Sequence, residues 1–178
     1  MAQITFVTGP VRSGKSRFAL ELARTWGEGV VFGATYRSDP ADSDMQARVR
    51  RHRLERPSGW RTLEAPEDFA QALGALDPPP NGLLFDCLTL WLGARMDASD
   101  EAILSDWQCI LEYLRLAPYP AVIVSNEIGW SLVPEHPELR RFRDIAGWLG
   151  QATAAASNEV WLCVAGCPLQ IKSNVTGN

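Results

Sequence analysis

The sequence predicts an α/β protein with three layers, in which helices cover both faces of a mostly parallel sheet. Short apolar runs rich in β-branched residues alternate with longer segments of helical periodicity along the chain. The first run leads directly into Gly9–Ser16 (GPVRSGKS), which matches the phosphate-binding pattern G-x-x-x-x-G-K-[ST]. A length of 178 residues with 46% hydrophobic content fits a single domain, residues 1–178, with a sizeable core and a loose polar tail at 173–178.

The elements of the first half are marked by apolar runs and by the residues that end them. The strand at 3–8 precedes a helix from 15 to about 26, which Gly27 and Gly29 close. In chain order there follow a strand at 30–35, a polar loop at 37–43, a basic segment at 45–56, an edge strand at 60–64 and a helix at 67–76. Pro57 ends the basic segment, because proline interrupts helical hydrogen bonding.

The second half repeats the alternation. In chain order we expect a strand at 83–86, a short apolar segment at 88–93, a helix at 99–116, a strand at 121–125, a loop at 127–137, a helix at 138–157 and a last strand at 159–165. Periodicity alone does not define the order of these strands within the sheet.

Composition limits the classes of function. Lys and Arg number 17 against 21 Asp and Glu, so the net charge of −4 gives no overall attraction to nucleic acid or to an anionic membrane. The first residues, MAQITFVTG, lack the features of a secretory signal, and no apolar run reaches the ~18 residues of a membrane span. Four cysteines without a C-x-x-C pair, and only two histidines, favour reduced thiols over a zinc site. We therefore expect a soluble cytoplasmic protein without stable membrane insertion and without a nucleic-acid partner.

The stretch GPVRSGKS predicts a nucleotide site. Gly9 and Gly14 permit backbone angles that direct several N–H groups at one anion, and the helix that follows adds its positive end. Lys15 would reach the β- and γ-phosphates, and the Ser16 hydroxyl would bind Mg²⁺. The predicted nucleotide-binding residues of this stretch are Gly9, Pro10, Val11, Arg12, Ser13, Gly14, Lys15 and Ser16. A chance match is the alternative, and the position between a strand and a helix argues against it.

Acidic residues at the ends of other strands are candidates for the metal. Asp86 ends the run LLFD, where an acidic residue would complete the Mg²⁺ site, although an aspartate there could also cap the following segment. Glu127 also follows a strand, at the edge where ligands of open α/β sheets bind, and is a further candidate beside a structural role.

The basic segment MQARVRRHRLERP, residues 45–57, allows three interpretations. If it is helical, Arg48, His52 and Arg56 share one face. It could be a solvated basic helix, as most such segments are, or a nucleic-acid contact, which the lack of aromatics and the acidic composition disfavour. It could also be a phosphate pocket in which neighbouring arginines keep His52 neutral and nucleophilic.

Taken together, these motifs resemble the bifunctional adenosylcobinamide kinase/adenosylcobinamide-phosphate guanylyltransferase family of cobalamin biosynthesis. The resemblance runs from about residue 4 to Lys172. Its most specific parts are R-x-x-x-H-x-x-x-R-P followed by W-x-x-x-E, and the run SNEIGWSLVPEHPELRRFRDIAG.

The resemblance implies a two-step enzyme with a RecA-like P-loop fold. ATP or GTP would phosphorylate adenosylcobinamide, and GMP from GTP would then pass through a guanylylated His52 to adenosylcobinamide phosphate, giving adenosylcobinamide-GDP. It also implies Mg²⁺ and a homotrimer. Further residues expected near the nucleotide are Thr35, Tyr36, Arg51, Arg53, Glu64 and Asp86. A kinase without the second activity, a nucleic-acid-stimulated NTPase and a nucleotide-binding regulator are the alternatives.

Other conspicuous side chains receive structural interpretations. Pro10 stands where the family has a second glycine, so one backbone donor to phosphate would be missing. Expected core or packing residues are Trp91, Trp148, Trp161, Cys163 and Cys167. Trp130 is a candidate for substrate contact, and His136 is expected at the surface. For Arg140, Arg141 and Arg143 two interpretations stay open, a phosphate contact across a subunit boundary and a solvated helix face.

Overall fold

A computed structural model describes residues 3–36 and 42–173, with the side chains of Arg48 and His52 outside the described part. The elements in chain order are β1 (Ile4–Gly9), α1 (Lys15–Arg24), β2 (Val30–Ala34), α2 (Ser43–Glu55), β3 (Arg61–Glu64), α3 (Phe69–Gly74), β4 (Gly82–Asp86), α4 (Leu88–Gly93), α5 (Asp100–Leu116), β5 (Ala121–Asn126), α6 (Pro137–Ala156), β6 (Glu159–Val164) and β7 (Cys167–Lys172). Most of the predicted loop at 37–43, namely 37–41, lies outside the described residues, as do 174–178 of the predicted tail.

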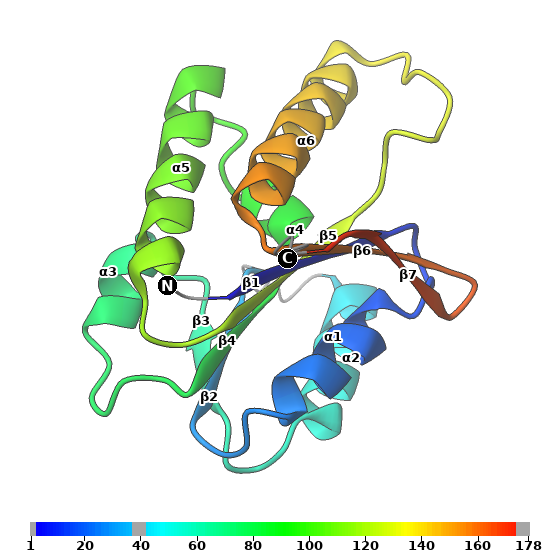
Figure 1. Ribbon diagram of the computed structural model, residues 1–178. Coiled ribbons are helices and arrows are strands. Elements are labelled where there is room, and N and C mark those ends of the chain that lie inside the picture. Colours follow the sequence, from blue (N-terminus) through cyan, green and yellow to red (C-terminus); the bar gives the residue numbers. More distant parts are fainter. Residues whose placement is uncertain (1–2, 37–41, 174–178) are drawn as a thin grey trace, which may run out of the picture.

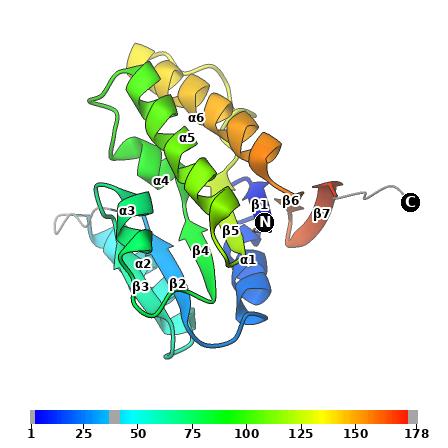
Figure 2. The ribbon, with the colours of Figure 1, turned by 60° about the vertical axis from the view of Figure 1, so that its left-hand side comes forward.

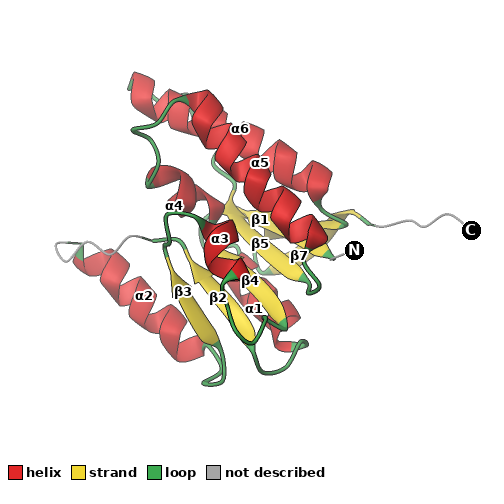
Figure 3. Cartoon of the chain, turned by 90° about the vertical axis from the view of Figure 1, so that its left-hand side faces the viewer, coloured by secondary structure: helices red, strands yellow, loops and turns green. Residues whose placement is uncertain are grey.

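The predicted α/β fold with a mostly parallel sheet is confirmed. The strand order is β3-β2-β4-β5-β1-β6-β7, and every neighbouring pair is parallel except β6 with β7. Helices α1 and α2 lie on one face of the sheet and α3 to α6 on the other, which gives three layers (Figures 1 and 3). Among the described residues, no helix combines the length and the apolarity that crossing a membrane requires.

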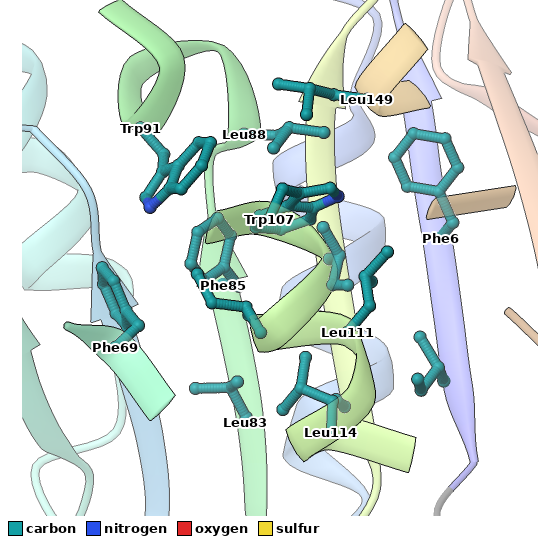
Figure 4. Close-up of a cluster of buried hydrophobic side chains, with 14 of the residues drawn as sticks. Phe6, Phe69, Leu83, Phe85, Leu88, Trp91, Trp107, Leu111, Leu114 and Leu149 are labelled. Carbon is teal, nitrogen blue, oxygen red and sulfur yellow. The ribbon is translucent and has the colours of Figure 1, made fainter. Parts of the chain in front are cut away.

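The larger part of the core lies between the sheet and helices α3 to α6. Phe85 of β4 packs between Phe69 and Trp107, with ring centroids 4.9 and 5.3 Å apart, and Trp91 packs on Trp107 at 5.1 Å (Figure 4). The indole N–H of Trp107 donates to the hydroxyl of Thr153 at 2.9 Å, so this buried donor is satisfied. A smaller cluster of buried hydrophobic side chains lies between α1 and the opposite face of the sheet. The sheet thus has a hydrophobic cluster packed against each of its faces.

Several expectations about the second half were wrong. A seventh strand, β7, follows the one predicted as last; its residues are all exposed, so no apolar alternation marks it, and Pro168 is compatible with a strand at the sheet edge. The apolar segment at 88–93, to which the sequence analysis assigned neither helix nor strand, is a short helix, α4. Trp148 is 48% exposed on the outer face of α6, and Cys167 is exposed in the edge strand. Trp91 is buried as expected, while Trp161 is half-buried and packs on Phe18.

Helix α2 is the basic segment, and it is polar along its length. None of its residues whose side chains are described is buried. Its first turn is capped by Asp42, whose side chain accepts from the N–H of Met45. The helix ends at Glu55, and Arg56 has extended backbone angles before Pro57. The expected helical face shared by Arg48, His52 and Arg56 is therefore wrong for Arg56, which has left the helix.

Candidate active site

The carboxyl ends of the parallel strands bring most of the predicted site residues to one edge of the sheet. In the strand register Gly9 lies opposite Asn126, and Asp86 lies opposite Val124 of the same strand β5. A cavity of about 480 Å³ opens over this edge. The predicted site residues that line it are Val11, Arg12, Ser13, Gly14, Lys15, Ser16, Thr35, Tyr36, Arg51, Arg53, Glu64 and Asp86. Gly9 and Pro10 form the start of the phosphate loop, directly before this lining.

The phosphate loop has the backbone of an anion site. Gly14 has a φ of 89° and is the N-cap of α1, so the N–H groups of the first helical turn point out of the helix end without intrahelical acceptors. The Ser13 hydroxyl is buried and has no hydrogen-bond partner among the described residues. A buried hydroxyl without a partner is costly, and a phosphate oxygen in the loop would satisfy it.

Lys15 is held at the base of the loop. Its ammonium donates to the carbonyl of Pro10 at 3.2 Å, and the residue is only 8% exposed. Burial lowers the pKa of Lys15, and the nearby Cys87 and Asp86 partly oppose that effect. Pro10 supplies no N–H, but its carbonyl also accepts from the N–H of Ser13 at 3.2 Å and so closes the turn of the loop. A poorly solvated cation at the loop is suited to bind phosphate.

The hydroxyl of Ser16 and the carboxylate of Asp86 suit a magnesium ion. Both residues are half-buried and line the same cavity, and they also meet at a second, small cavity beside it. Mg²⁺ prefers oxygen ligands and commonly takes one or two from the protein, with water and substrate phosphates completing the octahedron. These two side chains could therefore hold the ion, and bound there it would neutralise phosphate charge.

Arg56 also lines the cavity, although the sequence analysis did not include it among the nucleotide-binding residues. Its guanidinium carbon lies 3.3 Å from the centroid of the Phe32 ring, and Nη1 donates to Thr62 at 3.3 Å. Burial lowers its pKa to about 10, although Asp86 attracts the charge, so the group remains cationic at neutral pH. Its Nε is buried without a partner among the described residues. Pro57 could have indicated this position of Arg56, since the residue before a proline disfavours helical backbone angles.

Thr35 and Asn126 organise the floor of the cavity. The hydroxyl of Thr35 donates to the Cys87 carbonyl at 2.7 Å and accepts from the Cys87 N–H at 2.8 Å, which ties β2 to the turn that carries Asp86. Asn126, which was not predicted, donates its side-chain amide to Thr89 at 2.8 Å. These bonds hold Thr35 against Cys87, the residue after Asp86, and the expected contact of Thr35 with the nucleotide stays a prediction.

Two predicted nucleotide-binding residues pair with each other. Arg53 of α2 forms an ion pair with Glu64 at the end of β3, and both side chains are mostly exposed. Farther along, Arg24 of α1 donates to the carbonyl of Glu55 at 2.8 Å. These contacts hold the polar helix α2 against β3 and α1. Arg51 lines the cavity from the same helix.

The arginines of α6 are engaged within their own chain. Arg143 donates to the carbonyls of Gly129, Ser131 and Leu132, and Arg140 to those of Pro134 and Glu135. Arg141 pairs with Asp100 at 2.7 Å and also donates to the carbonyls of Met96 and Ala98. Within the chain these arginines thus brace two loops, and a phosphate contact across a subunit boundary stays a prediction.

The segment 127–137 leaves the sheet edge beside the phosphate loop. The N–H of Glu127 donates to the Gly9 carbonyl at 2.9 Å, and its carboxylate accepts from the N–H of Gly129. Trp130 is 66% exposed, and His136 is exposed at the N-cap of α6, as expected of a surface residue. The observed contacts of Glu127 are structural, within the loop and toward β1.

Comparison with known proteins decides the family. A family model described as cobinamide kinase / cobinamide phosphate guanyltransferase matches residues 5–171. The chain belongs to this family. It is 40% identical to the bifunctional adenosylcobalamin biosynthesis protein CobP of Pseudomonas aeruginosa, over 93% of this chain and 95% of that protein. It is 37% identical to the bifunctional adenosylcobalamin biosynthesis proteins CobU of Escherichia coli and of Salmonella typhimurium, in each case over 93% of this chain and 98% of the relative.

Proposed function

We propose that the protein phosphorylates adenosylcobinamide with ATP or GTP and then transfers GMP from GTP to adenosylcobinamide phosphate, through a guanylylated His52. Membership in the cobinamide kinase / cobinamide phosphate guanyltransferase family supports both activities. The observation that carries the proposal is that one cavity is lined both by the phosphate loop and by Arg51 and Arg53, the neighbours of His52 in α2.

In the first step the phosphate loop holds the triphosphate. Backbone N–H groups at the start of α1 and the Lys15 ammonium bind the β- and γ-phosphates, and charge develops on the transferred phosphoryl oxygens beside them. Ser16 and Asp86 would hold Mg²⁺, which would supply further neutralisation of the phosphate charge. The acceptor is the aminopropanol hydroxyl of the corrinoid, which loses its proton as the bond to the γ-phosphorus forms and the nucleoside diphosphate leaves.

In the second step an imidazole nitrogen of His52 attacks the α-phosphorus of GTP. A P–N bond forms and pyrophosphate leaves; the phosphate of adenosylcobinamide phosphate then attacks the same phosphorus, and His52 is released. The intermediate divides one difficult transfer into two easier ones. Arg51 and Arg53 flank His52 in sequence and line the cavity, where their charge would offset that of the phosphates.

Labelling with GTP tests the nucleophile. The protein is incubated with Mg²⁺ and GTP labelled at either the α- or the γ-phosphate. The label on the protein is detected on a denaturing gel, and the mass of the intact protein is measured by mass spectrometry. We expect an acid-labile, alkali-stable label from α-labelled GTP only, with a GMP mass increment. His52→Ala should lose it, whereas His136→Ala, which changes an exposed histidine at the N-cap of α6, should keep it. A wild-type protein that binds GTP without taking up label would refute the histidine intermediate.

The same variant separates a bifunctional enzyme from a kinase alone. His52→Ala should still phosphorylate adenosylcobinamide, because the phosphate loop is on β1 and α1 and not on α2. It should form no adenosylcobinamide-GDP. If the wild-type protein also makes only the phosphate, the guanylyltransferase half of the proposal fails and the kinase half stands.

We also propose that the protein forms the homotrimer that the family resemblance implies. The exposed edge strand β7 supports association, since it carries Leu169 and Ile171 at 60% and 57% exposure. Sedimentation equilibrium on the 19.7 kDa chain would give the number of copies directly. A single species at the monomer mass at micromolar concentration would refute the assembly.

A further inference from the structure

The β6–β7 hairpin touches the phosphate loop with its backbone at two places. The N–H of Gly166, in the hairpin turn, donates to the Ser13 carbonyl at 2.9 Å. A Cβ added to Gly9 would lie 2.3 Å from the carbonyl oxygen of Cys163, and one added to Gly14 would lie 3.2 Å from the Cα of Gly166. Both glycines of the phosphate-binding pattern therefore lie against the hairpin.

The turn itself is a tight, left-handed one. Ala165 and Gly166 are the two residues between β6 and β7, and their φ values are 51° and 83°. Positive φ at both central residues is typical of the type I′ turn, whose twist matches that of a two-residue hairpin. Alanine is unfavourable in this region, so pairing of the flanking strands must hold it there. The direction of the Gly166 N–H is thus set by the hairpin.

The bond to Ser13 fixes the orientation of a peptide group in the phosphate loop. The Ser13–Gly14 bond is not among the cis peptides, and in a planar trans peptide the C=O and the N–H point in opposite directions. With the Ser13 carbonyl directed at the hairpin, the N–H of Gly14 must point away from it. Gly14 is the N-cap of α1, where N–H groups bind anions.

We propose that the Ala165–Gly166 turn is a positioning element for nucleotide binding: by holding the Ser13 carbonyl, the Gly166 N–H turns the Gly14 N–H toward the phosphates. The proposal rests on the phosphate-loop part of the proposed function. It gives a role to the edge hairpin, whose strand β7 buries none of its residues in the described chain. Figure 2 shows this hairpin at the end of the sheet, beyond β1.

Replacing one amide by an ester tests the bond without changing any side chain. A thioester of residues 1–162 can be ligated at Cys163 to a synthetic peptide of residues 163–178 in which an ester joins Ala165 to residue 166. The ester removes the N–H and keeps the chain length. The all-amide ligation product is the matched control.

Two probes are titrated, GTP and inorganic tripolyphosphate, at a temperature where both proteins are folded by circular dichroism. We expect the ester protein to bind each about tenfold more weakly, which corresponds to about 1.4 kcal/mol and lies within the net contribution of a single hydrogen bond. Guanosine, which has no phosphate, distinguishes positioning from general loosening, since its affinity should not change. Equal affinity of the two proteins for tripolyphosphate would overturn the proposal.

Substitutions in the full recombinant chain give a second test. A Cβ at Gly166 would meet nothing within 4 Å, so Gly166→Asn and Gly166→Val differ mainly in tolerance of the left-handed φ. Asn should bind tripolyphosphate within twofold of wild type, and Val about tenfold more weakly. Lys15→Ala is the reference for the site itself: if it binds tripolyphosphate normally, the proposed phosphate site fails, whereas loss in Lys15→Ala with no effect of Val refutes only the role of the turn.

Discussion

Removing the charge of Arg56 should weaken nucleotide binding while the stability of the nucleotide-free protein stays almost unchanged. In Arg56→Met the apolar stem remains and the guanidinium over Phe32 is lost. Without nucleotide, opposing effects nearly cancel. A cation–π contact of about 0.5–2 kcal/mol and the exposed, long hydrogen bond to Thr62 disappear, and the unfavourable burial that lowers the pKa of Arg56 to about 10 is relieved. We expect the free energy of unfolding to change by less than about 1 kcal/mol.

The effect on binding should be much larger. A hydrogen bond to a charged group contributes about 1.5–3 kcal/mol, which corresponds to roughly 10- to 150-fold in affinity. The buried Nε without a partner among the described residues, and the position in the cavity lining, make Arg56 available for such a contact. Arg56→Lys keeps the charge but not the planar fork, so it should recover only part of the loss.

Titration with a fluorescent GTP analogue measures the affinity, and urea unfolding without nucleotide measures the stability. Arg17→Met is the matched control, because Arg17 also lines the cavity but its side chain is 72% exposed and forms an ion pair with Glu21 on the same exposed helix face. If Arg56→Met binds GTP within twofold of wild type, the guanidinium does not contact the nucleotide. A fall in both affinity and stability would mean that Arg56 acts by holding α2 and β3 together.

Two more predictions follow from the buried ionisable groups. Lys15→Met should raise the melting temperature of the nucleotide-free protein by about 2–4 °C, a change of roughly 1 kcal/mol, and it should abolish stabilisation by GTP. Because folding lowers the pKa of Lys15, the unfolded chain binds more protons at this residue than the folded protein does. The stability of the wild-type protein should therefore rise as the pH approaches 10.5, and Lys15→Met should lack this rise. Burial raises the pKa of Cys87 to about 11 and also raises that of Cys163, so a thiol reagent at pH 8 should titrate only the exposed Cys109 and Cys167 until the protein unfolds. Native reaction at Cys87, or an unchanged melting temperature in Lys15→Met, would contradict these assignments.

The features that the sequence predicted well are those whose signal is local. The phosphate loop needs only a strand, a turn with fixed glycines and a helix start, and all of these lie within Ile4–Arg24. Asp86 was placed because a buried strand ends there, and the carboxyl ends of parallel strands share one edge. These two local signals are enough to predict that the proposed phosphate-binding and metal-binding residues lie close together.

The features that it missed depend on contacts between distant segments. Strand β7 has no buried face, so neither alternation nor an apolar run marks it, and its register is set by pairing with β6. The arginines of α6 look like a charged helix face until the loop carbonyls they bind are placed beside them. Arg56 appeared to continue a helical face, and only the backbone before Pro57 shows that it turns over Phe32.

Three carbonyl groups of the phosphate loop accept hydrogen bonds from within the protein. The Gly9 carbonyl accepts from the N–H of Glu127, that of Pro10 from Lys15, and that of Ser13 from the N–H of Gly166. These donors come from the loop after β5, from α1 and from the β6–β7 hairpin. With the Gly9 and Ser13 carbonyls bound to residues outside the loop, the loop does not need to reorganise to present its N–H groups, and binding avoids the cost of ordering them. The missing N–H of Pro10 is then a small loss, since the loop depends on that residue for its carbonyl.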